Sequence, residues 1–178
     1  MAPAARPARV GKHERDDRRQ GTPTSPRAAP VLARRARILR RCGGGLPASA
    51  RGQVPKGSQH SPWQLLEHLR LAQADILEFC VSRRYEEKQW PRDYWPATAA
   101  PPSARAWNAS IAAFRSDRRT LERLVLNPRR DLLAPVPAGT GQTLLREVLL
   151  AADHAAYHIG QLVAVRRALG HWAGPKQG

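Results

Sequence analysis

The sequence has little cysteine and no long hydrophobic run. Only two cysteines, Cys42 and Cys80, occur among 178 residues, too few for the disulfide framework of a small secreted domain. The N-terminal segment has no apolar stretch of about 7–15 residues of the kind a signal peptide needs, and no run approaches the roughly 20 apolar residues that span a bilayer. We therefore expect a soluble, cytoplasmic protein without membrane association.

Acidic residues are also scarce. The chain has 30 Lys and Arg against 14 Asp and Glu, a formal net charge of +16, and residues 1–56 hold 14 of the basic residues but only 3 of the acidic ones. Basic segments bind polyanions without sequence preference. We therefore expect contact with nucleic acid only as non-specific binding by this basic segment.

The N-terminal segment has few large apolar side chains as well. Residues 1–29 are rich in Pro, Arg and small residues, and burial of so little apolar surface cannot offset the conformational entropy of the chain, whereas 30–42 carries enough apolar residues for a short basic helix. We predict a disordered basic extension over 1–45 with a short helix at 30–42, a folded domain over 46–172, and a C-terminal tail over 173–178.

Sustained period-two alternation, the signal of a half-buried strand, is missing too. Helix signals are abundant instead. Ser61 is a good N-cap, Pro62 suits the first helical position, and Gln64 completes a capping box, so these residues predict a helix over 61–83.

Two further helices follow from the same kind of pattern. Apolar residues recur at helical spacing over 103–127 and over 143–169, and Gly170 ends the second of these segments. Three long helices and the weaker segment at 30–42 predict an all-α, up-down four-helix bundle with a weak or degraded first helix.

An aromatic loop separates the first two strong helices. Residues 84–102 contain four prolines, which prevent regular helix, together with Trp90, Tyr94 and Trp95. Long loops in compact domains are usually functional or disordered. The aromatics predict either a lid over a pocket or an aromatic plug that closes one end of the core.

The histidines carry the chemical signal. His154 and His158 are one helical turn apart, so both imidazoles can reach one ion, and His68 lies on the inward side of another strong helix. Metal sites of helical bundles are assembled from facing helices in this way. Three ligands leave a coordination position open, as in catalytic sites. The competing interpretation is core histidines that are satisfied by hydrogen bonds.

Two other residues are weaker candidates. Glu147 lies seven residues before His154 on the same face and could orient a ligand imidazole, although an acid in a first turn is also favoured by the helix dipole. His60 precedes the N-cap and has a smaller chance of lying near the pocket.

Three segments resemble a known family. The stretches "HSPWQLLEHLRLAQADILEF", "WPRDYWP" and "LLREVLLAADHAAYHIGQLVAVRRALGHW" are similar to the DinB-like (DinB/YfiT) superfamily of small four-helix-bundle metalloproteins, over about residues 46–172. The resemblance implies that His68, His154 and His158 bind a divalent metal, with zinc and nickel as the expected ions. It also implies a low-molecular-weight thiol as a possible cosubstrate, because characterised relatives use such thiols in transfer or isomerisation.

These observations lead to one main hypothesis and two alternatives. The main hypothesis is a metal-dependent transferase or hydrolase acting on a small molecule, in which the cation lowers the pKa of a water or thiol held at its open position. The alternatives are a metal-binding bundle without turnover and a binding module whose basic tail contacts nucleic acid. A homodimer could cover the face that a degraded first helix leaves open.

Overall fold

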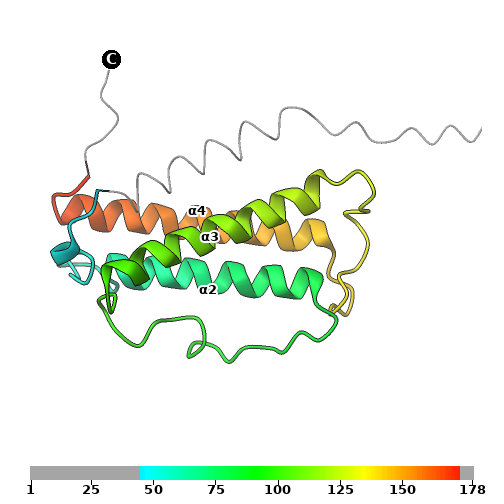
Figure 1. Ribbon diagram of the computed structural model, residues 1–178, viewed down its shortest axis with the longest axis horizontal. Coiled ribbons are helices and arrows are strands. Elements are labelled where there is room, and N and C mark those ends of the chain that lie inside the picture. The colour runs from blue at the N-terminus through cyan, green and yellow to red at the C-terminus, as the bar shows by residue number, and fades with distance from the viewer. Residues whose placement is uncertain (1–44, 173–178) are drawn as a thin grey trace, which may run out of the picture.

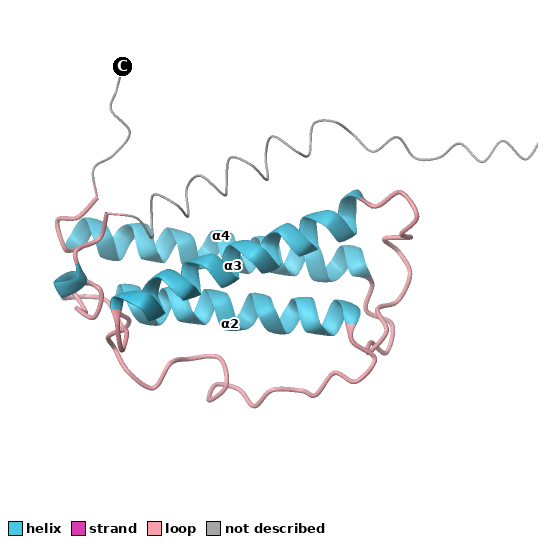
Figure 2. Ribbon diagram, viewed as in Figure 1, coloured by secondary structure: helices cyan, strands magenta, loops and turns pink. Residues whose placement is uncertain are grey.

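The computed structural model describes residues 45–172 as three long α-helices, shown in Figures 1 and 2. They are α2 (Pro62–Val81), α3 (Ala104–Leu126) and α4 (Leu144–Ala168), and a short 3-10 helix, η1 (Ala48–Ala50), precedes them. The described residues contain no strand, only an isolated bridge between Pro135 and Thr143. The chain is thus all-helical over this part. The predicted helix at 30–42, almost all of the predicted extension, and the tail lie outside the described residues.

Each of the three long helices begins directly after a residue whose side chain caps it. The Ser61 hydroxyl accepts from the Gln64 backbone N–H at 3.1 Å, and the Gln64 side-chain oxygen accepts from the Ser61 N–H at 3.0 Å. The predicted capping box is therefore confirmed. Ser103 and Thr143 cap α3 and α4 in the same way, each accepting from a backbone N–H three residues on. Such caps satisfy N–H groups that have no partner within the helix.

The helix directions differ from the up-down succession that the sequence predicts. Trp63 and Trp107, near the starts of α2 and α3, have ring centroids 6.4 Å apart, and Gln73 donates to the Phe114 carbonyl about two to three turns further along both helices. These two helices are therefore parallel, whereas α4 runs antiparallel to them. The reason is visible in Figure 1, where residues 82–103 return along the whole length of α2 before α3 begins.

The middle helix of the packing is α2, which contacts both of the others. Leu65 packs in a cluster with Leu162 on α4, and Leu69 packs against Phe114 on α3. By contrast, α3 and α4 contact each other little. The inward faces of α2 and α4 therefore lie opposite each other, and both carry histidines.

By length and composition alone, α4 could cross a membrane, with 25 residues and a mean hydropathy of 1.2 over its most apolar window. Helices that pack in the core of soluble proteins pass the same test. Here α4 packs against α2 and carries Glu147, Asp153 and two histidines within its length. The finding is weak evidence for a membrane span.

Candidate metal centre

Three imidazoles from two helices converge on one spot. The Nε2 atom of His68 lies 3.1 Å from the Nε2 atom of His158 and 3.0 Å from the Nε2 atom of His154. The possible ligand atoms of these residues all lie within 4.8 Å of one another. The structure thus brings together the three histidines that the sequence singled out.

The convergence follows from the antiparallel packing of α2 on α4. His68 is 1% exposed and points from α2 toward α4. His154 and His158 occupy successive turns of α4, so their rings lie along one face with centroids 4.5 Å apart and planes tilted by 57°. Leu65 and Leu162, fully buried one turn away on the two helices, hold this part of the interface together.

Hydrogen bonds at the other ring nitrogen fix the orientation of two of the imidazoles. The Nδ1 atom of His68 donates to the backbone carbonyl of Tyr94 at 2.9 Å, and Nδ1 of His158 donates to the Gln161 side-chain oxygen at 2.7 Å. Both contacts are to oxygen atoms, which accept, so each bond requires the proton on Nδ1 and leaves the Nε2 lone pair facing the centre. This is the arrangement of ligand histidines with an outer partner.

The aromatic loop covers His68. The Trp95 indole stacks on the imidazole with a centroid distance of 4.0 Å and an interplanar angle of 3°, and Trp90 approaches its edge at 6.2 Å. Trp95 is half-buried and packs beside the cluster of Leu65 and Leu162, whereas Trp90 is 65% exposed. Trp95 therefore closes core and histidine site together, and Trp90 lies at the surface beside them.

A buried carboxylate anchors this loop. Asp75 lies two turns after His68 on α2 and is 7% exposed. It accepts from the Tyr94 hydroxyl at 2.6 Å and from the Tyr85 hydroxyl at 3.1 Å, and the Lys88 ammonium lies 3.1 Å away. All three partners belong to the loop. Asp75 therefore holds the loop on α2, in the position where the Tyr94 carbonyl meets His68.

Burial keeps the candidate ligands neutral. Desolvation is the main cause that lowers the pKa of each ring, and it lowers the pKa of His154 to about 4 with help from His158 and His68. In His68 the bond to the Tyr94 carbonyl opposes the shift, and in His158 the bond to Gln161 does. Neutral imidazole is the form that binds metals, so the rings are ready to act as ligands near neutral pH.

Glu147 lies away from the three histidines. It is 3% exposed and pairs with the Arg146 guanidinium. Burial, followed by the Glu147 charge, raises the pKa of the Cys80 thiol to about 12. Glu147 therefore faces the end of the bundle that holds Cys80, and the structure places the Tyr94 carbonyl and Gln161 at the outer nitrogens instead.

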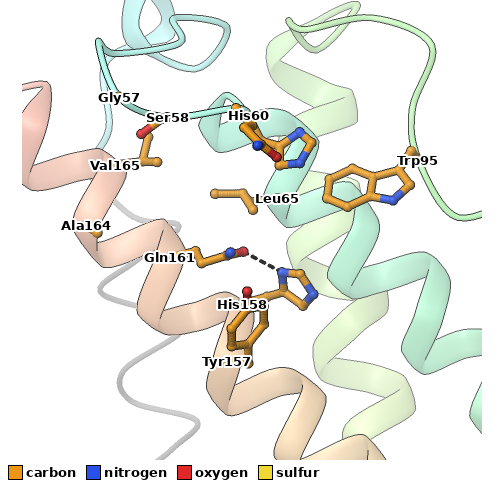
Figure 3. A pocket seen from close by; sticks show the side chains of 11 residues that line it. Gly57, Ser58, His60, Leu65, Trp95, Tyr157, His158, Gln161, Ala164 and Val165 are labelled. Carbon is orange, nitrogen blue, oxygen red and sulfur yellow. Dashed lines mark hydrogen bonds between the residues drawn. The ribbon is translucent and has the colours of Figure 1, made fainter. Parts of the chain in front are cut away.

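A cavity of about 560 Å³ opens beside His158, as Figure 3 shows. His60 and Trp95 lie on one side of it, and Tyr157 and Gln161 lie on the α4 side with His158. His60 also stacks on Trp95 at 4.2 Å. Its volume is within the range of about 300–1,000 Å³ that is usual for small-molecule sites.

Three residues around the site carry only weak signals in the sequence. Gln161 is one helical turn after His158, a spacing that allows contact but does not distinguish it from a surface glutamine. Asp75 is a mid-helix acid whose partners come from a loop. The Tyr94 carbonyl has no side-chain identity, so no pattern could indicate it.

The donor set fits a divalent transition metal. Nitrogens bound about 2.0–2.1 Å from one ion lie roughly 2.8–3.4 Å apart at octahedral or tetrahedral angles, and the Nε2 atom of His68 lies 3.1 and 3.0 Å from those of His158 and His154. The lone pairs of His68 and His158, which face each other at 3.1 Å, also repel unless a cation or a proton lies between them. The fold and the site thus define an all-helical protein, over the described residues, with a three-histidine cluster that could hold a metal ion.

The comparison with protein families agrees with this class. The model of the DinB superfamily matches residues 32–162, which is most of the chain, and the chain belongs to this superfamily. Neither a curated protein nor a solved structure shows significant similarity to it. The family match and the histidine cluster together fit a metal-binding DinB-like protein.

Proposed function

We propose that His68, His154 and His158 bind one divalent cation and that the protein is a metal-dependent enzyme acting on a small molecule. The observation that carries the proposal is the meeting of three Nε2 atoms at 3.0 and 3.1 Å, two of them with Nδ1 bonded to an acceptor. With their Nδ1 atoms donating to Tyr94 and Gln161, the Nε2 atoms of His68 and His158 carry no proton and cannot hydrogen-bond each other at 3.1 Å, so mutual satisfaction of core histidines does not account for this contact.

Zinc and nickel are the proposed metals, because neutral imidazoles suit both. When bound, such a cation would supply Lewis-acid chemistry and lower the pKa of a coordinated water or thiol. A low-molecular-weight thiol as cosubstrate follows from the family and is part of the proposal. The reaction that we propose for this centre is a group transfer or a hydrolysis, and the proposed location of the protein is the cytoplasm.

The residues around the centre have separate tasks in this proposal. The Tyr94 carbonyl and the Gln161 oxygen hold the Nδ1 protons of His68 and His158, so that Nε2 stays available. Trp95 covers one face of His68 and keeps water from it. His60 and Tyr157 give the cavity beside His158 hydrogen-bonding groups for a polar small molecule.

Elemental analysis tests the metal site. The wild-type protein should carry roughly one divalent metal ion per chain, as expected of a single three-ligand site. A His154→Ala, His158→Ala double variant should carry none, and a His171→Ala variant, changed beyond α4, should match the wild type. Metal retained unchanged in the double variant would refute the assignment. Turnover is then tested by a thiol-transfer screen with and without chelator.

A fourth helix is part of the same proposal. The family match begins at residue 32, so we place the segment 30–42 inside the domain. Because α3 and α4 contact each other little, a cavity of about 90 Å³ lies between them, lined by apolar groups such as Val125, Val148 and Ala152. The apolar side chains of 30–42 would cover this groove and complete a four-helix bundle.

Two truncations test the fourth helix. Removal of residues 1–29 should leave the free energy of unfolding unchanged, whereas removal of 1–45 should lower it, because apolar surface between α3 and α4 becomes exposed. An unchanged free energy after removal of 1–45 would contradict the proposal. A full-length chain that is dimeric by light scattering would instead favour a second copy as the cover of this groove.

A further inference from the structure

A second cavity reaches the histidine centre from another side. It has a volume of about 220 Å³ and is lined by His68 and His154, whereas the larger cavity is lined by His158. The two cavities share no lining residue. Consecutive loop residues divide them, because Tyr94 lines the smaller cavity and Trp95 lines the larger one.

The smaller cavity is apolar where a ligand would lie. Its walls, apart from the two histidines, include Ala72, Ile76, Trp90 and Leu150. Its remaining polar groups, the Asp75 carboxylate and the Tyr94 hydroxyl, are bonded to each other at 2.6 Å, and Asp75 also has Tyr85 and Lys88 as partners. These polar groups are therefore already satisfied.

The larger cavity has a different character. His60, Ser58, Gln59, Tyr157 and Gln161 bring hydroxyl, amide and imidazole groups to its lining. Polar groups of a ligand can form hydrogen bonds there, but a hydrocarbon group placed there would strip water from these side chains without replacing their hydrogen bonds. The two sides of the centre thus favour different parts of a ligand.

We propose that the smaller cavity is a binding site for an apolar group, the size of an aromatic ring or a short branched alkyl chain, on a ligand held at the histidine centre. A cavity of about 150 Å³ lined by aliphatic side chains is sufficient for benzene, so 220 Å³ suffices for such a group. The inference rests on the proposed metal site and adds the substrate class, a metal-binding head with an apolar substituent.

Two hydroxamates test the proposal on the cobalt(II)-loaded full-length protein. Acetohydroxamate and benzohydroxamate share the chelating head, so the ratio of their dissociation constants isolates the ring, and binding is followed by the visible absorption of cobalt. Benzohydroxamate should bind about tenfold more tightly, as expected for partial burial of a phenyl ring.

The variants change one cavity at a time. Leu150→Trp fills the smaller cavity from a position that is 43% exposed, and Trp90→Ala removes a wall of the same cavity at another exposed position. Each should abolish the preference for benzohydroxamate and leave acetohydroxamate affinity within about twofold. Ala164→Trp, an exposed lining position of the larger cavity, is the matched control and should keep the preference.

The outcomes separate two kinds of failure. If the wild type develops no cobalt absorption, the metal site itself is wrong and the inference falls with it. If cobalt and acetohydroxamate bind but the ring gives no advantage, or if only Ala164→Trp abolishes that advantage, the metal site stands and the apolar site is refuted.

Discussion

Replacement of Asp75 by asparagine tests whether the loop anchor also sets the geometry of the metal centre. The substitution keeps the shape of the side chain but removes its charge. The native carboxylate accepts from the Tyr94 and Tyr85 hydroxyls at 2.6 and 3.1 Å and lies 3.1 Å from the Lys88 ammonium. Lys88 keeps a second partner, Glu78, at 2.8 Å.

The magnitude follows from these contacts. Hydrogen bonds to a charged group contribute about 1.5–3 kcal/mol each, and the amide retains one acceptor oxygen for one phenol. The ion pair with the partly exposed Lys88 contributes little. We therefore expect Asp75→Asn to lower the free energy of unfolding of the metal-free protein by about 1.5–3 kcal/mol.

The effect on metal binding is a separate expectation. Loss of the outer partner of a ligand histidine usually weakens metal binding by about 10–100-fold. Asp75 acts on His68 only through Tyr94, whose carbonyl receives the Nδ1 proton at 2.9 Å. We therefore expect the lower end, about tenfold weaker binding. Urea unfolding measures the stability, and competition with a chromophoric chelator measures the affinity.

Two further variants decide whether Asp75 acts through Tyr94. Tyr94→Phe should weaken metal binding as Asp75→Asn does, and the double variant should be no worse than either, because both remove the same contact. Tyr85→Phe removes the other phenol and should cost about 1.5–3 kcal/mol of stability with metal affinity within twofold. A folded Asp75→Asn protein with wild-type affinity, or an equal loss in Tyr85→Phe, would refute the reasoning.

Three other expectations concern the centre and the fold. Between pH 6.5 and about 4, the unfolded chain binds a proton at His154 that the native state does not, so the unfolding free energy of the metal-free protein should fall as the pH is lowered through this range. A free energy of unfolding, measured in urea, that stays constant from pH 7 to pH 5 would contradict the conclusion that the His154 ring is buried and neutral. Gln161→Leu removes the acceptor of the His158 Nδ1 proton and should weaken metal binding about tenfold in the same competition assay, whereas an unchanged affinity would show that the ring is held by packing alone. In Gly52→Ala, the added Cβ would lie 2.5 Å from the Ala100 Cβ and 2.9 Å from its Cα, so thermal unfolding should report a loss of about 1–3 kcal/mol, and a neutral result would mean that this loop contact yields freely.

Local signals in the sequence were sufficient for the helices. The capping residues Ser61, Ser103 and Thr143 begin α2, α3 and α4, within one residue of the predicted starts. A capping hydrogen bond and the helical spacing of apolar residues both involve residues that are close in the sequence, so both can be recognised without knowledge of the fold. The same holds for the His154–His158 pair, whose spacing alone places both rings on one face.

The direction of the helices could not be predicted in this way. The sequence predicts an up-down order, but the loop over 82–103 returns along α2 and makes α3 parallel to it. Loop length permits such a return without requiring it. Contacts such as that between Tyr94 and Asp75, nineteen residues apart, hold the loop in this course.

The sequence by itself therefore determined the helices, the histidine pair on α4 and the family to which the chain belongs. The sequence also singled out His68 as the partner of this pair, whereas the tertiary structure alone decided that a backbone carbonyl and Gln161 bond the outer ring nitrogens and that two separate cavities reach the centre. The physical reason is the range of the interactions. Caps and periodicity depend on neighbours in sequence, whereas burial, ring orientation and cavity shape depend on residues that only packing brings together.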